Sequence, residues 1–163
     1  MLVLDCTLRD GGYYNSWNFP QRVVEQYLQA MDAANVDIVE LGMRSLKNEG
    51  FKGAAGFTTD EYLDTLPLPS SLKVGVMVNA SELVSASSLE EALVSLFPKN
   101  AEESKVDLVR IACHVHEFEQ ALPSCKWLKD RGFLVGFNLM QVAERSQAEV
   151  EALALAASKY DID

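Results

Sequence analysis

The sequence contains no apolar run of the length that a membrane-spanning helix needs, about 18 to 20 residues. The N-terminus has neither the basic segment nor the cleavage site of a secretory leader, because Asp5 interrupts the first apolar stretch. These absences argue against a membrane partner. We therefore expect a cytoplasmic protein.

Cysteine and basic residues are also sparse. The 3 cysteines form no C-x-x-C pair, which argues against a disulfide framework and a zinc knuckle. Lys and Arg number 14 against 24 Asp and Glu, for a formal net charge of −10. Nucleic-acid binding needs a concentration of basic side chains that displaces counterions. The charge balance therefore predicts no nucleic-acid partner.

What the chain does contain is a series of short, β-rich apolar runs. The runs are mostly continuous rather than alternating, which is typical of strands buried on both faces. They cover Leu2–Cys6, Asp37–Gly42, Lys73–Val78, Asp107–Ala112 and Phe133–Asn138.

Helical patterns occupy the segments between these runs. One apolar stripe begins soon after Pro20, and a second ends before Gly132. The first consists of Val23, Val24, Tyr27, Leu28 and Met31; the second consists of Phe118, Ala121, Leu122, Cys125 and Leu128. Three S/T-x-x-E pairs predict helix starts. They are Ser88 with Glu91, Ser146 with Glu149, and Thr58 with Glu61.

Alternation of strand and helix predicts a parallel α/β sheet. The units recur at about 25 to 35 residues, close to the roughly 30 of an eight-unit TIM barrel. Ile162 is expected to begin a sixth strand. We predict a partial (β/α) TIM barrel of about five to six βα units; a complete, open doubly wound sheet is the alternative. An unpaired sheet edge would also favour self-association.

The segment from Asp5 to Gly12 reads D-C-T-L-R-D-G-G and directly follows the first predicted strand. Catalytic groups of a TIM barrel collect at the carboxyl ends of its strands. The Asp10 carboxylate is a hard oxygen ligand for Mg²⁺ or Mn²⁺. The Arg9 guanidinium suits an enolate or carboxylate oxygen. Gly11 and Gly12 are expected to form turns that let a ligand approach.

This segment resembles the D-x-T-L-R-D-G motif of the DRE-type TIM-barrel metallolyases, the HMG-CoA lyase-like superfamily. That group includes 4-hydroxy-2-oxovalerate aldolase, HMG-CoA lyase and isopropylmalate synthase. Three further stretches are similar to the superfamily, the last two to its aldolase branch. They are Val36–Gly42, Val109–His114 followed by Glu117, and Leu134–Met140. The resemblance identifies residues 1–163 as the N-terminal portion of such a barrel domain.

The resemblance implies a metal-dependent carbon–carbon lyase that acts on a small 2-oxo acid. Asp10 would ligate the divalent metal, with Mn²⁺ or Mg²⁺ preferred and Zn²⁺ or Co²⁺ as alternatives. Arg9 would stabilise the enolate oxygen. Glu40 would lie at the wall of the site and orient Arg9 or a water molecule.

The sequence departs from the superfamily pattern in two places. The superfamily completes its metal site with an H-x-H pair on the seventh strand, so residues 1–163 alone are expected to be inactive. The aldolases place a histidine two residues past the motif glycine, whereas this chain has Gly12 and Tyr13 there. Tyr13 is therefore the candidate for the acid or base at this position. The alternatives are an acyl-CoA Claisen enzyme of the same superfamily and a non-catalytic scaffold barrel.

Several polar residues near predicted strand ends are candidates for substrate contacts. They are Arg110, His114, Asn138, Arg44 and Asn79, and loop polarity explains Asn138, Arg44 and Asn79 equally well. The His114-Val115-His116 sequence is not interpreted as a metal pair, because it leads into a helix. Arg9 with Asp10 could also be a plain surface ion pair, and Glu40 a salt bridge to a neighbouring strand. The aromatic residues after the motif are expected to form a lid or the packing of the barrel mouth. They are Tyr13, Tyr14, Trp17 and Phe19.

Overall fold

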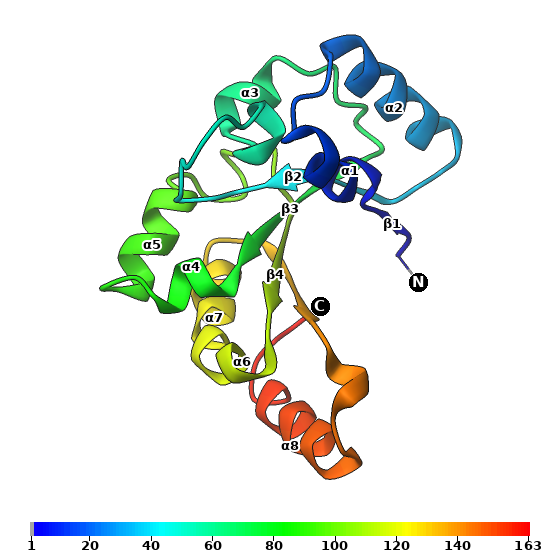
Figure 1. The fold of residues 1–163 in the computed structure, drawn as a ribbon. Helices are drawn as coiled ribbons and strands as arrows, with labels where there is room; N and C mark the ends of the chain where they lie inside the picture. The colour runs from blue at the N-terminus through cyan, green and yellow to red at the C-terminus, as the bar shows by residue number, and fades with distance from the viewer. Residues whose placement is uncertain (1) are drawn as a thin grey trace.

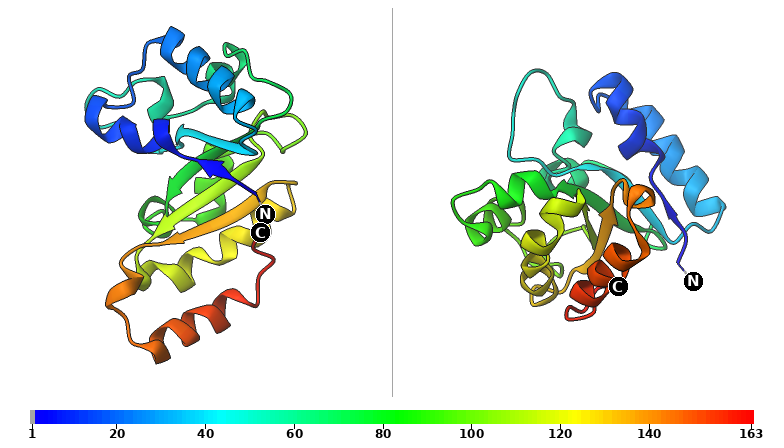
Figure 2. Two further views of the ribbon diagram at one scale, coloured as in Figure 1. Left: turned by 90° about the vertical axis from the view of Figure 1, so that its right-hand side faces the viewer. Right: turned by 60° about the horizontal axis from the view of Figure 1, so that its bottom comes forward.

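A computed structural model describes residues 2–163 and contains one curled sheet of five parallel strands in sequence order (Figure 1). The strands are β1 (Leu4–Asp5), β2 (Ile38–Met43), β3 (Lys73–Asn79), β4 (Leu108–Cys113) and β5 (Leu134–Leu139). Helices alternate with the strands and form an outer layer around them (Figure 2). The predicted fold class, a partial parallel α/β barrel, is confirmed.

The four long strands begin within one residue of their predicted starts. The first strand is shorter than predicted, since only Leu4 and Asp5 pair with β2. Val3 still contacts the neighbouring strand, because its carbonyl accepts hydrogen bonds from the N–H groups of Asp37 and Ile38.

The segments that follow the strands contain eight α-helices and two short 3₁₀ turns within residues 2–163. Those before β4 are α1 (Thr7–Asn15), α2 (Gln21–Ala33), η1 (Ala54–Gly56), α3 (Asp60–Asp64), α4 (Ala80–Val84) and α5 (Leu89–Leu96). Those after β4 are α6 (Val115–Ala121), α7 (Pro123–Lys129), η2 (Val142–Glu144) and α8 (Gln147–Ala157). None of the described helices has both the length and the hydropathy to cross a bilayer.

Two helix predictions need correction. The stripe that ends at Leu128 belongs to two helices, α6 and α7, because Pro123 cannot continue the hydrogen-bond ladder and begins α7 instead. Helix α3 is capped by Thr59, whose side chain accepts from the Tyr62 N–H, and not by Thr58. The predicted caps Ser88 and Ser146 are confirmed by the same kind of bond.

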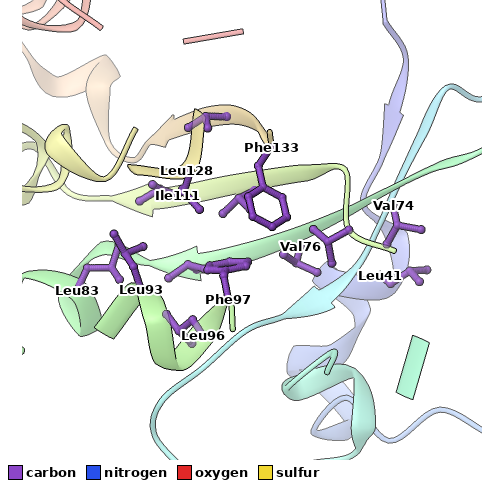
Figure 3. Close-up of a cluster of buried hydrophobic side chains, with 14 of the residues drawn as sticks. Leu41, Val74, Val76, Leu83, Leu93, Leu96, Phe97, Ile111, Leu128 and Phe133 are labelled. Carbon is purple, nitrogen blue, oxygen red and sulfur yellow. The ribbon is translucent and has the colours of Figure 1, made fainter. Parts of the chain in front are cut away.

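The main hydrophobic core lies between the outer face of the sheet and the helices (Figure 3). Strand residues such as Val76 and Ile111 are fully buried there against helix residues such as Leu93 and Leu128. Burying one such side chain contributes about 1.5–3 kcal/mol relative to leaving it exposed. This layer is therefore the main source of stability and leaves the other sheet face for different chemistry.

The inner face of the sheet is arranged in cross-strand rows, because side chains of neighbouring parallel strands lie side by side. A register shift between Glu40 and Gly42 in β2 places Met43, and not Gly42, beside Met77. Three rows follow from the register. They are Glu40, Gly75, Leu108 and Leu134; then Met43, Met77, Arg110 and Gly136; then Asn79, Ala112 and Asn138 at the carboxyl end.

Near the amino end of the sheet, three aspartate–valine pairs each form two hydrogen bonds, one in each direction; we call this arrangement the aspartate–valine exchange. In each pair the valine N–H donates to the aspartate carboxylate at 2.7 or 2.8 Å. The aspartate N–H donates back to the carbonyl of the same valine. The pairs are Val3 with Asp37, Val74 with Asp107, and Val135 with Asp163. Ile162, expected to begin a sixth strand, lies in no strand; Asp163 instead holds the position that Asp37 and Asp107 hold before β2 and β4.

Candidate active site

The first part of the D-C-T-L-R-D-G-G motif starts helix α1. The Asp5 carboxylate accepts the Thr7 N–H at 2.9 Å, the Thr7 hydroxyl at 3.1 Å and the Tyr27 hydroxyl at 2.6 Å. Burial would raise the pKa of Asp5, but these hydrogen bonds outweigh it and lower the pKa. Burial, followed by the bond to Asp5, raises the pKa of Tyr27. Asp5 and Thr7 therefore set the geometry of the motif.

The predicted turn at Gly11 and Gly12 is wrong, because both residues lie within α1. Gly12 is required for close packing: a Cβ at this position would lie 2.0 Å from the Trp17 ring. Left-handed backbone at Ser16 and Trp17 (φ 56° and 55°) turns the chain back over the helix. The Trp17 indole N–H then donates to the Arg9 carbonyl at 3.0 Å. The aromatic ring thus fixes the backbone that carries Arg9.

Arg9 and Arg110 share a single carboxylate, that of Glu40. The Nε of Arg9 lies 2.6 Å from Oε1 of Glu40. Arg110 approaches the same carboxylate with two nitrogens, Nε at 2.8 Å from Oε2 and Nη2 at 2.9 Å from Oε1. The Glu40 side chain is 0% exposed, against 10% for Arg9 and 22% for Arg110. This cluster is called the Glu40 network below.

The barrel architecture explains why Glu40 and Arg110 meet although β3 separates their strands. Side chains of alternate strands share one layer of a barrel interior, and β2 and β4 are alternate strands. Glycine stands beside both of them, Gly75 opposite Glu40 and Gly136 opposite Arg110. A Cβ on Gly136 would lie 3.4 Å from the Arg110 side chain. The Arg110 stem therefore packs over Gly136 in the neighbouring strand.

The charge of the Glu40 network is not balanced within its buried part. Burial would lower the pKa of Arg9, but the hydrogen bond and charge of Glu40 outweigh this effect and raise the pKa. Two guanidinium groups face one buried carboxylate, and Asp10 supplies the next negative charge through an ion pair with Nη1 of Arg9. The Asp10 carboxylate is 58% exposed. It also accepts from the Cys6 thiol at 3.3 Å, and burial together with this bond raises the pKa of Cys6.

The other predicted site residues lie around the network. Asn138 is half-buried in the row at the carboxyl end of the sheet. Tyr13 is 61% exposed and packs edge-on against Trp17, with ring centroids 4.7 Å apart. Within residues 2–163, no hydrogen bond joins Tyr13 to Arg9 or Glu40. Tyr13 therefore contacts the site only through Trp17.

His114 lies where β4 ends and α6 begins. Its N–H donates to the Glu117 carboxylate at 2.8 Å, and its ring stacks on that of His116 with centroids 5.7 Å apart. Both histidines line a cavity of about 390 Å³ that also includes Gln141 and Arg145. His114 thus lies at the carboxyl end of β4, at a helix start.

Arg44, one of the polar residues that follow a predicted strand, points away from the inner face. Its Nη1 donates to the Leu96 carbonyl at 2.8 Å and its Nε to the Thr58 carbonyl at 3.1 Å. Its Nη2 lies 3.2 Å from the Asp60 carboxylate. Burial lowers the pKa of Arg44, although the charge of Asp60 opposes this effect. Arg44 therefore joins the outer helices and contacts none of the Glu40 network.

Sequence reasoning missed an apolar cluster on the inner face. Met43, Met77 and Ala112 are buried there, and Trp17 and Met140 pack against them. The available signal was that three of the apolar runs each have a methionine near or just after their end, namely Met43, Met77 and Met140. The register shift in β2 hid this signal, because strict alternation would have placed Met43 on the outer face. The cluster gives the site an apolar wall beside its charged residues.

The donor set decides whether these residues fit a divalent metal. Asp10 offers one half-exposed carboxylate, and both oxygens of Glu40 are taken by arginine. Across residues 2–163, no group of three or more His, Cys, Asp or Glu side chains is placed to hold a metal ion. These residues therefore supply one ligand and do not by themselves form a metal centre.

No family model matches the chain. Among solved structures, the chain is similar to the crystal structure of the "N-terminal domain of a putative aldolase" from Bacteroides vulgatus. The two are 28% identical in sequence and superpose with a TM-score of 0.71. The match covers 99% of this chain and 62% of the other, so this chain spans less than two thirds of that protein's length.

Proposed function

We propose that this chain carries the enolate-binding part of an aldolase-type carbon–carbon lyase that acts on a 2-oxo acid. The observation that supports this most is Arg9, held by buried Glu40 on the inner face of a partial barrel. The similarity to the structure described as the "N-terminal domain of a putative aldolase" points the same way. Membership in the DRE-type metallolyase superfamily, and in its aldolase branch, is part of the proposal.

Retro-aldol cleavage explains what Arg9 would do. A base takes the proton of the 4-hydroxyl group, the bond between C3 and C4 breaks, and C4 becomes an aldehyde carbonyl. The electron pair passes to C3, and negative charge develops on the oxygen at C2. A guanidinium held in place by Glu40 and by the Trp17–Arg9 hydrogen bond stabilises this oxyanion without reorganisation. Tyr13 is the proposed acid or base.

Asp10 is the proposed carboxylate ligand of a divalent metal, Mn²⁺ or Mg²⁺ first and Zn²⁺ or Co²⁺ as alternatives. A metal of this kind polarises a carbonyl as a Lewis acid. Since the described residues supply a single ligand, the remaining donors would have to come from other segments. Asp10→Asn should weaken the binding of Mn²⁺ to the natural polypeptide, as measured by the electron paramagnetic resonance of free Mn²⁺. An unchanged affinity would remove Asp10 from the metal site.

Enolate formation can be tested without knowing the aldehyde product. The natural polypeptide that carries residues 1–163 is incubated with pyruvate in D₂O and each of the four metals, and loss of the pyruvate methyl signal is followed by proton NMR. We expect exchange that Arg9→Met slows by about 10²–10³-fold, the usual effect of losing one oxyanion donor. Arg22→Met, on an exposed position of α2, is the matched control and should exchange at the wild-type rate.

The outcomes separate the candidate functions. Exchange at the methyl group of acetyl-CoA but not of pyruvate would indicate the Claisen alternative. Absence of exchange with either compound would indicate a non-catalytic scaffold. Equal rates in Arg9→Met and Arg22→Met would overturn the role of Arg9.

Self-association is proposed from the free edge of β5. The Val135 N–H and carbonyl point away from β4 and bind Asp163, so alternation places the Phe137 and Leu139 N–H groups on the same open side. Unpaired edges of this kind recruit strands from other chains. For residues 1–163, light scattering after size-exclusion chromatography should show oligomers, and Leu139→Pro should reduce the fraction of oligomer. A monomer mass at every concentration would contradict the proposal.

A further inference from the structure

The Glu40 network leaves two guanidinium nitrogens without partners. Arg9 uses Nε for Glu40 and Nη1 for Asp10, while Arg110 uses Nε and Nη2 for Glu40. Within residues 2–163, Nη2 of Arg9 and Nη1 of Arg110 have no hydrogen-bond partner, yet neither is fully enclosed. Both donors are therefore available to a ligand, and both belong to cations that share one carboxylate.

The charge count defines the ligand that would suit these donors. Arg9, Arg110 and Glu40 together carry one net positive charge in a mostly buried setting. An unbalanced buried charge is costly, and a paired anion removes that cost. Asp10 brings the formal sum to zero, but its half-exposed charge is screened by solvent. An anionic ligand would therefore pair with the two free donors better than a neutral ketone or aldehyde.

We infer that Arg110, together with Arg9, recognises the carboxylate of the substrate, so that the site selects 2-oxo acids in their ionised form. The inference rests on the proposed function for the identity of the substrate, but not for the existence of an anion site. Guanidinium groups favour carboxylates because their planar donors match the two oxygens. Asn138 and His114, the other candidates, lack the permanent charge that this role needs.

The variant Arg110→Lys tests whether carboxylate recognition needs the guanidinium group or only its positive charge. Lysine keeps the positive charge and can still pair with Glu40, but it has one nitrogen and no second group for a ligand. The probes are pyruvate and its uncharged ester, methyl pyruvate, titrated into the natural polypeptide and followed by ligand-observed NMR. We expect wild type to bind pyruvate more tightly than the ester. Arg110→Lys should weaken pyruvate binding by about 10–100-fold and leave ester binding unchanged.

Arg44→Lys is the matched control, because Arg44 is a buried arginine of the outer layer with no contact to the network. It should leave the pyruvate-to-ester ratio at the wild-type value, and circular dichroism checks that both variants are folded. An unchanged ratio in folded Arg110→Lys overturns the inference. If pyruvate shows no deuterium exchange but the pyruvate-to-ester binding ratio depends on Arg110, the proposed aldolase function is overturned and the anion site stands.

Discussion

Two arginine clusters lie on the inner and the outer side of the sheet near β2, and they differ in whether their unused donors are enclosed. On the inner face, Arg9 and Arg110 share Glu40 and each keeps a free nitrogen. On the outer face, Arg44 donates to two carbonyls, pairs with Asp60 and lies over the Phe97 ring at 5.0 Å. The Nη2 of Arg44 also has no hydrogen-bond partner, but this nitrogen is enclosed, whereas the free nitrogens of Arg9 and Arg110 are not. Access to the unused donor therefore distinguishes an arginine available for chemistry from one that joins helices.

The largest effect should come from removing the carboxylate of either cluster. Glu40→Gln leaves Arg110 without a charged partner and Arg9 with only the half-exposed Asp10, and Asp60→Asn leaves Arg44 without one. Loss of one partner of a buried ion pair costs about 3–5 kcal/mol. We expect both variants to lower the free energy of unfolding by this amount, measured by urea denaturation.

Activity should separate the two variants where stability does not. In buffer without urea, at a temperature at which both variants remain folded, Glu40→Gln should lose pyruvate deuterium exchange. The reason is that Glu40 no longer holds Arg9 in place. Asp60→Asn should retain the exchange. Equal loss of exchange in both folded variants would show that the division between inner and outer clusters is wrong.

An intermediate effect is expected from the two adjacent glycines of α1. Gly12→Ala places a methyl group 2.0 Å from the Trp17 ring and should destabilise the fold by about 1–3 kcal/mol. It should also slow exchange, because Trp17 holds the Arg9 carbonyl. Gly11→Ala is the control: its Cβ would lie 3.7 Å from Phe19, an ordinary contact. Alanine inside a helix should stabilise it by about 0.5–1 kcal/mol. Thermal unfolding measures the sign of each change, and the same sign in both would refute the packing argument.

The smallest effect concerns Asp5, which starts α1 beneath Arg9. Its pKa in the folded protein is lower than the ordinary value of 3.8, so folding favours the charged form. The stabilisation is therefore present above pH 3.8 and is lost as the pH falls through the lowered pKa. Asp5→Asn should cost about 1 kcal/mol near neutral pH, because hydrogen bonds to a charged acceptor are stronger than those to a neutral one. In urea denaturation the difference from wild type should shrink below pH 3.8. A pH-independent difference would contradict this assignment.

The strands and the motif could be predicted from the sequence because their determinants are local. Continuous apolar runs predict buried parallel strands, and the T-L-R-D-G-G stretch singles out Arg9 and Asp10 as candidate site residues. The pairing of Arg9 with a glutamate at the end of an apolar run was anticipated through the resemblance, which gave Glu40 the role of orienting Arg9.

The rest of the site depends on relations that no single stretch contains. Arg110 meets Glu40 across the intervening strand β3, which depends on how the strands are placed side by side in the sheet. Arg44 turns outward because of the register shift in β2, a shift that the sequence does not mark. The role of Gly12 depends on where Trp17 folds back. These relations arise from packing between elements and not from the pattern within one element.

The recurring aspartate–valine exchange has a consequence for how the chain folds. The paired residues are 34, 33 and 28 positions apart, so each exchange closes a loop of nearly the same length. The entropy of loop closure grows with the logarithm of length, so the three closures differ by only roughly 0.2 kcal/mol. No single pair is favoured to form first on this ground. Loop-closure entropy therefore gives no pair precedence, and any order of formation has to come from the packing around each pair.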